Sequence, residues 1–450
     1  MGKTYYFCGV GGAGMSPLAR LLAAHGETVI GSDRSNDRGR NRHFFEQLRR
    51  EGIRLVPQDG SFVSQDIGAF IVTRAVEESI PDIRRARELG IPLIKRPALM
   101  ADIFATTRNI AVAGTSGKST TTGMIGFVLD RLGLQPTVMN GAEMIDFDSS
   151  FRRGGDRAVF EADESDGLND VVATCPAEIG VLTNISHDHF ELAELETIFG
   201  TFVHRAKHGV VLNADCPISM RLRRGVKNVV TFGFSPDADI TPAVLGGPLS
   251  VRGEHNVANA LAALAVVRLL GLDMERAAES VRAFRGIRRR LELVAHVDGI
   301  KYFDDFASNP GKIAATLKTL QAEGQRLIVV FQPHGFQPTK MMLSGYIETF
   351  ARLLRQQDLL VVTPIYYVGG TANVIDGSTV SLPTDISGND IVAGVCQRGG
   401  NARSVSDRAE VPPFLSGLLS AGDVVVSMGS RDETLPEFAR GLAGCSVSRR

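Results

Sequence analysis

The sequence predicts an α/β protein with three domains. The chain has 450 residues, whereas a single hydrophobic core stops growing at roughly 250–300 residues, so one core would not serve it. Short apolar runs of strand length alternate with stretches whose apolar residues recur at helical spacing. Two glycine-rich loops each lie between such a strand and such a helix, as in parallel βαβ units.

The first domain is expected over residues 1–107 and has the alternating order of a Rossmann-like fold. It opens with a strand, a helix and a strand, and a second unit of the same kind follows. The predicted elements are Thr4–Val10, Gly14–His25, Thr28–Ile30, Ala69–Thr73, Ile80–Leu89 and Pro92–Ile94.

The second domain is expected over residues 108–287. A strand, a glycine loop and a helix come first, and three strands and a closing helix follow. These elements are Asn109–Ala113, Thr122–Leu132, Arg157–Glu161, Ile179–Asn184, Gly209–Asn213 and Val257–Leu270. Arg285–Arg290 is interpreted as the exit from this domain.

The third domain, residues 288–450, is expected to be a smaller Rossmann-like α/β unit. Helices alternate with strands predicted at Tyr302–Phe303, Leu327–Phe331, Leu359–Val362 and Val424–Ser427. The segment Pro364–Ser387 is rich in Gly, Thr, Ser and Pro, and we interpret it as an ordered surface loop.

Composition excludes several classes of protein. With 49 basic and 50 acidic residues, the chain has no global field that would gather nucleic acid or anionic lipid, so neither is expected as a partner. The N-terminus runs from Met1 directly into a strand-like stretch, and no apolar run reaches the roughly 18 residues of a membrane helix. We expect neither export nor membrane insertion, and either a monomer or a homodimer.

The five cysteines indicate a reducing compartment. They are scattered, odd in number and free of any C-x-x-C pair: Cys8, Cys175, Cys216, Cys396 and Cys445. Neither a disulfide framework nor a zinc site is indicated, and a cytoplasmic location is expected.

The first glycine loop indicates a bound nucleotide diphosphate. Gly9, Gly11 and Gly14 form G-x-G-x-x-G, and Asp33 follows the second strand, near the usual acidic position for a ribose hydroxyl. Glycines let the backbone approach a pyrophosphate, and the amides of the following helix stabilise its charge. NAD, FAD and UDP-sugars all carry a pyrophosphate, so this loop alone leaves an NAD-dependent oxidoreductase open.

The second glycine loop, residues 114–120, is the more specific signal for a phosphate site. It reads Gly-Thr-Ser-Gly-Lys-Ser-Thr after a strand and before a helix, where backbone amides cradle phosphate oxygens. Lys118 would reach the β and γ phosphates, and Ser119 would bind Mg²⁺. Val112 stands where the common G-x-x-x-x-G-K-[ST] pattern has its first glycine, so the loop is not the generic form.

The second loop and five later motifs, in order along the chain, resemble the Mur ligases and their folylpolyglutamate synthetase relatives. The later motifs are Glu161–Asp166, Thr183–His189, Gly253–Ala260, and the pair Arg289–Glu292 and Asp304–Pro310. The resemblance covers nearly the whole chain. It implies a UDP-binding first domain, a central ATPase domain, and a C-terminal domain that completes the ATP site and binds the incoming amine.

The resemblance also implies an ATP site with magnesium. Lys118, Glu161 and His189 would be catalytic, and Ser119, Glu161 and His189 would bind the metal. Hydroxyl and carboxylate oxygens suit Mg²⁺, and one imidazole is acceptable beside them. The remaining ATP contacts would be Gly114, Thr115, Ser116, Gly117, Thr120, His255, Asn256, Asn259, Arg290 and Asp305. Helix-start roles for the two asparagines, and an interdomain salt bridge for Arg290 and Asp305, remain open.

The first domain resembles the branch of the family that acts on UDP-N-acetylmuramate. Its substrate contacts, together with one from the acidic motif of the second domain, would be Gly11, Gly12, Ala13, Gly14, Met15, Ser32, Asp33, Thr73, Arg74 and Ser165. One member of this branch adds L-alanine and another adds a tripeptide during recycling. Glu161–Gly167 and Phe331–His334 favour the first, whereas Arg288–Leu293 and Asp304–Ala307 favour the second.

Several departures from the branch leave the incoming amine open. Ser116, Ser308 and Asn309 stand where the branch usually has histidines, and the segment Gly335–Lys340 lacks its usual arginine. We predict an ATP-dependent acid–amino acid ligase that adds L-alanine to the lactyl carboxylate of UDP-N-acetylmuramate in peptidoglycan precursor synthesis, which supports the cell wall and cell shape. Tripeptide addition, a ligase for another carboxylate scaffold and a non-catalytic nucleotide-binding homologue are the alternatives.

Overall fold

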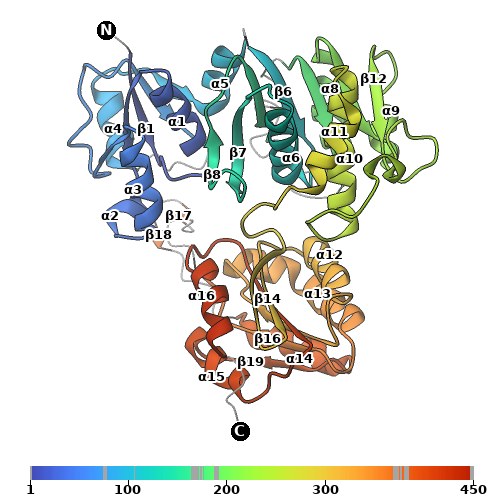
Figure 1. The fold of residues 1–450 in the computed structure, drawn as a ribbon. Coiled ribbons are helices and arrows are strands. Elements are labelled where there is room, and N and C mark those ends of the chain that lie inside the picture. The colour runs from blue at the N-terminus through green and yellow to red at the C-terminus, as the bar shows by residue number, and fades with distance from the viewer. Residues whose placement is uncertain are drawn as a thin grey trace. The chain divides into compact units, whose positions relative to one another are not determined.

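The computed structural model describes residues 3–73, 79–105, 107–163, 172, 175, 177–186, 192–367, 374–375, 378–379 and 385–445. The chain divides into two compact units, Met1–Ile287 and Arg288–Arg450. The first unit contains two sheets, and the second contains one large sheet and a two-stranded one (Figure 1).

The first sheet is a five-stranded parallel sheet in the order β3-β2-β1-β4-β5. Its strands are β1 (Thr4–Cys8), β2 (Thr28–Ser32), β3 (Arg54–Val56), β4 (Ala69–Val72) and β5 (Leu93–Lys95). The connecting helices are α1 (Ser16–Ala24), α2 (Arg34–Asp37), α3 (Arg42–Arg50), α4 (Pro81–Glu88) and α5 (Arg96–Phe104). The carboxyl ends of β1 and β2 therefore meet beside the first glycine loop.

The second sheet has seven strands in the order β12-β11-β10-β6-β9-β7-β8, and β8 alone among them is antiparallel to its neighbour. Its strands are β6 (Arg108–Ala113), β7 (Thr137–Met144), β8 (Ser149–Arg152), β9 (Arg157–Glu161), β10 (Ile179–Leu182), β11 (Gly209–Asn213) and β12 (Val229–Phe232). The helical elements are α6 (Lys118–Arg131), α8 (Leu192–Arg205), α9 (Pro217–Arg221), η2 (Pro242–Leu245), α10 (Glu254–Leu269) and α11 (Met274–Arg282).

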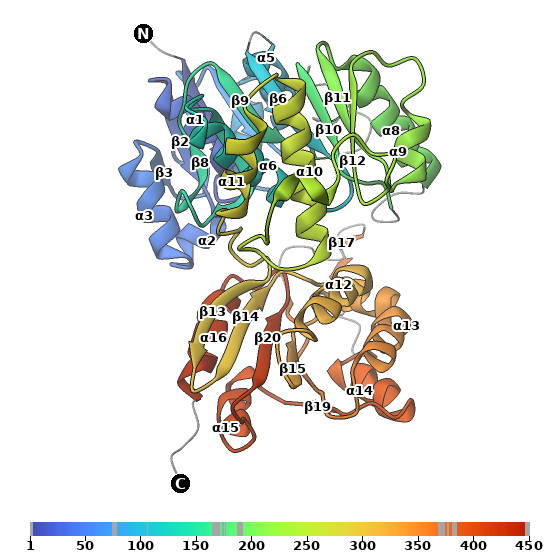
Figure 2. The same ribbon diagram turned by 45° about the vertical axis from the view of Figure 1, so that its right-hand side comes forward.

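The two faces of this sheet contribute side chains to two different hydrophobic cores. Ile110 and Val112 of β6 pack with residues of α6, α10 and α11, the helices that lie together over one face of this sheet in Figure 2. Ala111 and Ala113 face the other way and pack with α8 and with residues of the first sheet's domain. Because successive side chains of a strand point to opposite faces, one apolar strand serves both cores.

Two contacts join the first two sheets into one unit. Phe104, at the end of α5, stacks on Phe160 of β9 with ring centroids 4.5 Å apart. The buried Arg20 of α1 donates to the hydroxyl of Ser149 in β8 at 2.7 Å, and its Nε lies 2.8 Å from a carboxylate oxygen of Glu51. A buried guanidinium needs such partners, so Arg20 fixes α1 against β8.

The large sheet of the second unit has the order β13-β14-β20-β15-β16-β19, with only the β13–β14 pair antiparallel. Its strands are β13 (Glu292–Val297), β14 (Ile300–Asp305), β15 (Arg326–Phe331), β16 (Leu359–Val362), β19 (Ala402–Ser404) and β20 (Asp423–Met428). The main helices are α12 (Pro310–Leu320), α13 (Phe336–Leu353), α14 (Gly388–Gln397), α15 (Val411–Ser416) and α16 (Leu435–Leu442). Short 3₁₀ turns lie at Arg408–Glu410 and Ala443–Cys445, and β17 (Val374–Ile375) pairs with β18 (Ser378–Thr379).

The chain reverses direction across this sheet between β15 and β20. Helices α12, α13 and α14 pack in sequence on one face, whereas α15 and α16 pack on the other (Figure 2). The segment after β15 leads to α13, and the segment after β20 leads to α16. The two segments thus leave adjacent strands toward opposite faces, which makes this a topological switch point, where ligands of open α/β sheets bind.

The predicted fold class, an α/β chain of three domains built on parallel sheets, is confirmed. The precise domain limits stay predictions. Strands β3, β7, β8, β12, β13 and β19 were not predicted from the sequence, and α6 begins four residues before its predicted start. Much of the loop predicted at Pro364–Ser387 lies outside the described residues. Among the described residues, no helix combines the length and apolar character needed to cross a membrane.

Candidate functional site

The second glycine loop connects β6 to α6 and requires its two glycines. Gly114 has φ +127°, and a Cβ there would lie 2.1 Å from the hydroxyl oxygen of Thr183. Gly117 has φ +84°, and its Cβ would lie 2.5 Å from Oδ1 of Asn259. Any other residue would be strained at both positions, so the loop can close only with glycine.

Lys118 begins α6 beside two carboxylates. Its ammonium group donates to the carbonyl of Gly114 at 2.7 Å and lies 3.9 Å from Asp163. Desolvation raises the pKa of Glu161, against the lowering effects of the Gly141 N–H, the Lys118 charge and the Ser119 hydroxyl. The Gly141 N–H donates to Glu161 at 2.5 Å. Glu161 therefore lies near Lys118 and Ser119, and its catalytic and metal-binding roles stay predictions.

Thr183 and Asn184, which follow β10, support the loop from the adjacent strand. The Thr183 hydroxyl donates to the carbonyl of Ser116 at 2.7 Å. The amide of Asn184 donates to the same carbonyl at 3.0 Å, and its oxygen accepts from the Thr115 hydroxyl at 2.8 Å. Both residues belong to one of the motifs that resemble the Mur ligases, but no role was predicted for them. Their position after a strand parallel to β6 was the signal.

Helix α10 reaches the loop through Asn259. Its Oδ1 accepts from the Thr121 hydroxyl at 3.1 Å, and its Nδ2 donates to Asn256 at 3.1 Å. Asn256 in turn donates to the carbonyl of Arg252 at 2.6 Å. Both asparagines are buried, whereas the neighbouring His255 is exposed. The adenine contacts of all three, and the phosphate contact of Thr120 in the first turn of α6, stay predictions.

The first glycine loop is held against the end of β2. Gly9 N–H donates to the carbonyl of Ser32 at 2.8 Å, and Gly11 N–H donates to the carboxylate of Asp33 at 2.9 Å. A Cβ at Gly11 would lie 2.8 Å from that carboxylate. Gly12 and Ala13 are exposed at the tip of the loop, whereas Met15 is buried in the core. The loop is most exposed to solvent at its tip.

The Ser32 side chain faces inward, and Gly14 packs closely against Arg96. The Ser32 hydroxyl donates at 2.5 Å to the buried Asp82, which also accepts from Tyr6 at 2.9 Å. A Cβ at Gly14 would lie 2.8 Å from the guanidinium of Arg96. Thr73 directly follows β4, so it lies at the same carboxyl edge as the loop. Any substrate contact of Ser32 would use its backbone.

In the second unit, Asp305 organises the turn that precedes the sheet. Its carboxylate accepts from the N–H groups of Leu291 at 2.7 Å and Ala307 at 2.8 Å, and from the Thr316 hydroxyl. These bonds lie within its own unit. The guanidinium of Arg290 lies 4.8 Å from the ring centroid of Phe306. The nucleotide contacts predicted for Arg290 and Asp305 stay predictions.

The switch point of the second unit brings His334 beside Ser430. The Ser430 hydroxyl lies 3.1 Å from Nδ1 of His334. Burial and the nearby charge of Arg431 lower the pKa of His334 to about 4, so its imidazole is uncharged at neutral pH.

Two of the residues that stand where the branch usually has histidines have structural partners in the second unit. The side chain of Asn309 caps α12 by accepting from the Lys312 N–H, and the Ser308 carbonyl accepts from the Tyr346 hydroxyl.

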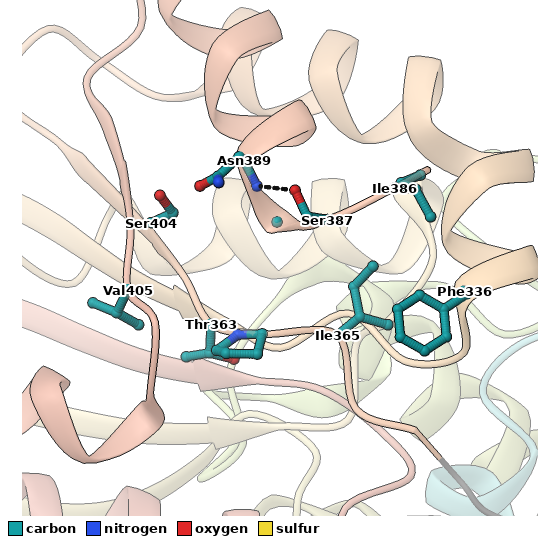
Figure 3. Close-up of a pocket in the computed structure, with 10 residues that line it drawn as sticks. Phe336, Thr363, Ile365, Ile386, Ser387, Asn389, Ser404 and Val405 are labelled. Carbon is teal, nitrogen blue, oxygen red and sulfur yellow. Dashed lines mark hydrogen bonds between the residues drawn. The ribbon is translucent and has the colours of Figure 1, made fainter. Parts of the chain in front are cut away.

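A cavity of about 230 Å³ lies next along the sheet, at the carboxyl ends of β16 and β19. Figure 3 shows Phe336 and Ile365 together on one side of the cavity and Ser404 and Val405 on the other. Ser387 caps α14 there, because its hydroxyl accepts from the Asn389 N–H at 3.2 Å. The first residue of α13 therefore lines a second hollow near the switch point.

Three predicted site residues, Arg74, Ser165 and His189, lie outside the described residues. Within the described residues, no group of three or more His, Cys, Asp and Glu side chains is placed to hold a metal ion. Of the three proposed magnesium ligands, only Glu161 is both one of these four residue types and among the described residues. The absence of such a group there therefore does not test the proposed magnesium site. The hydroxyl of Ser119 and the carboxylate of Glu161 are oxygen ligands of the kind Mg²⁺ binds.

Three family models together match most of the chain. The model of the Mur ligase family, catalytic domain, matches residues 4–108. The Mur ligase middle domain matches residues 112–267, and the Mur ligase, glutamate ligase domain matches residues 289–431. The three matches follow the order of the three sheets.

Similar proteins cover the chain almost from end to end. The UDP-N-acetylmuramate–L-alanine ligase of Dinoroseobacter shibae is 34% identical over 94% of each chain, and that of a Cyanothece species is 33% identical over 97% of this chain and 95% of its own. The crystal structure of the UDP-N-acetylmuramate-alanine ligase of Thermotoga maritima is 26% identical, with a TM-score of 0.76 and 97% of each chain covered. A murein peptide ligase from Psychrobacter arcticus, 21% identical with a TM-score of 0.67, shares the fold. The chain belongs to the Mur ligase family of ATP-dependent amide-bond ligases.

Proposed function

We propose that this enzyme joins L-alanine to the lactyl carboxylate of UDP-N-acetylmuramate, with ATP and Mg²⁺, as a step of peptidoglycan precursor synthesis. The phosphate loop with Lys118, Ser119 and Glu161 at the ends of adjacent strands carries the proposal. The similar L-alanine ligases support the choice of substrates.

The reaction requires activation of the carboxylate, because a carboxylate and an amine do not condense in water at useful rates. A carboxylate oxygen attacks the γ phosphorus of ATP, ADP leaves, and an acyl phosphate forms. The amine then attacks the acyl carbon, phosphate leaves and the amine loses a proton. The loop amides and the Lys118 ammonium group would stabilise the negative charge that gathers on the transferring phosphoryl group.

Ser119, Glu161 and His189 would hold the magnesium. A bound Mg²⁺ supplies positive charge that screens the mutually repelling anions. Glu161 suits this role, since it is a partly desolvated carboxylate whose charged form a cation would favour. Asp163, close to Lys118, would keep the local charge balanced before ATP binds.

The sugar nucleotide would bind at the first glycine loop. The exposed backbone at Gly12 and Ala13 can approach a pyrophosphate closely, and α1 follows directly with the positive end of its dipole. Asp33 orders this loop through its bond to the Gly11 N–H. The two nucleotides would therefore bind to separate loops on different sheets.

The test is phosphate release from MgATP in the presence of UDP-N-acetylmuramate. L-alanine, glycine, L-serine and the L-alanyl-D-glutamyl-diamino-acid tripeptide are compared as acceptors. We expect release that depends on both the sugar nucleotide and L-alanine, with product mass increased by one alanine residue. Release with the tripeptide alone would replace L-alanine addition by tripeptide addition. No release with any acceptor, despite tight ATP binding, would contradict the proposal.

A further inference from the structure

The switch point of the second unit presents an unpaired arginine. Arg431 lies two residues before the turn into α16 and is exposed, and its charge is close enough to His334 to lower that residue's pKa. Among the residues that the structure describes, none forms a hydrogen bond or ion pair with its guanidinium. An exposed cation at the carboxyl edge of a parallel sheet is a candidate for ligand binding.

The acidic and basic neighbours of Arg431 already have partners. The carboxylate of Asp432 accepts from Arg408 at 2.6 Å and from the Thr434 N–H at 2.9 Å. Asp304 lies 3.3 Å from Arg289. These ion pairs leave the Arg431 charge uncompensated within the described part of the unit.

The segment after β15 offers no competing cation. Residues 335–340 contain no arginine, and their single basic residue, Lys340, forms an ion pair with Asp385. His334 is uncharged at neutral pH and is tied to Ser430. Asp432 and Glu433, which follow Arg431, both have partners. Arg431 is therefore the unpaired cation among the described residues of these two segments, which suits a ligand with one carboxylate.

We propose that Arg431 binds the carboxylate of the incoming amino acid, beside the Ser430–His334 pair. This inference rests on the proposed function. The carboxylate of an amino acid substrate does not react and keeps its charge, and a guanidinium can hold it through two parallel hydrogen bonds. An uncharged imidazole beside it avoids repelling a substrate that also carries an amino group. Arg431 is thus a specificity-determining residue for the amine.

Arg431→Gln tests the assignment in the full-length enzyme. Because a hydrogen bond between two charged groups is lost, the KM for L-alanine should rise about tenfold to hundredfold, while the KM values for ATP and UDP-N-acetylmuramate stay within about twofold. L-alaninamide, which lacks the carboxylate, gives the decisive readout. The unchanged enzyme should prefer L-alanine to L-alaninamide, and the variant should lose most of that preference in kcat/KM. A merely structural role would lower both activities together.

Two further variants complete the test. Arg440→Gln removes an exposed arginine of α16 and should leave the preference unchanged, whereas Arg431→Lys should retain part of it. An unchanged KM for L-alanine and an unchanged preference in Arg431→Gln would overturn this inference alone. If the unchanged enzyme turns over no amino acid at all, the proposed function fails, and this inference fails with it.

Discussion

The side-chain oxygen of Asn259 accepts a hydrogen bond from the Thr121 hydroxyl at 3.1 Å and so joins α10 to α6 beside the phosphate loop. Both residues are buried. Asn259 also lies where a Cβ at Gly117 would strike it. The phosphate loop is therefore held by α10 as well as by the segment after β10.

Asn259→Ala should lower both stability and ATP affinity. It leaves the buried Thr121 hydroxyl without its acceptor, which costs about 1–3 kcal/mol in the free energy of unfolding. The loosened loop should raise the KM for ATP. Chemical denaturation of Asn259→Ala, Thr121→Val and the double variant measures the coupling between the two side chains. A loss of ATP affinity with unchanged stability would show that Asn259 acts on the nucleotide alone.

Lys118→Ala should abolish ATP turnover with little loss of stability. Lys118 is largely buried, and its ammonium group donates to the carbonyl of Gly114 and lies 3.9 Å from Asp163. It stands in the phosphate loop, where a lysine charge stabilises transferring phosphate. Phosphate release and thermal unfolding are measured together, with the exposed Lys207→Ala as the matched control. Turnover in Lys118→Ala comparable to that of the control would remove the catalytic assignment.

Asp33→Ala should weaken sugar nucleotide binding and spare ATP. The carboxylate accepts from Gly11 N–H and from Ser35 N–H, so its loss frees the glycine loop and removes the cap of α2. Calorimetric titration of each nucleotide separates the two effects, and Glu46→Ala on the exposed side of α3 serves as the control. An equal loss of affinity for both nucleotides would argue against separate sites.

The sequence predicted the phosphate loop because every determinant is local. A strand, two glycines, Lys118 and a helix follow one another within a few residues. The left-handed backbone at Gly117 can be predicted from the glycine itself, without knowledge of any distant residue. The parallel sheets followed in the same way from apolar runs separated by helical stretches. Strand β7 was missed because Asn140 and Gly141 interrupt its apolar run.

Distant pairings were not predictable from one sequence. The substrate contact of Ser32 stays a prediction, but nothing in the sequence indicated that its hydroxyl bonds to Asp82, which lies 50 residues later. Arg20 falls within an apolar helix, and its partner Ser149 is 129 residues away. Such contacts depend on how the elements pack, and a linear pattern contains no signal for them. The switch point beside His334 likewise emerged only from the strand order.

Acidification should destabilise the protein through His334. Its pKa is about 4 in the folded state and 6.5 in the unfolded chain, because burial and the charge of Arg431 disfavour the imidazolium. Between these values the unfolded chain binds more protons, so the stabilising contribution is complete above pH 6.5 and is lost as the pH falls toward about 4.

His334→Gln isolates this contribution. The other titrating groups are common to both proteins, so the difference between their stabilities should change with pH only in the window from about 4 to 6.5. Denaturation at a series of pH values measures it, and proton NMR of the imidazole reports the pKa directly. Arg431→Gln should raise that pKa, since it removes a positive charge beside the ring. A His334 pKa near 6.5, or parallel stability profiles for the two proteins, would contradict the buried, uncharged imidazole at the switch point.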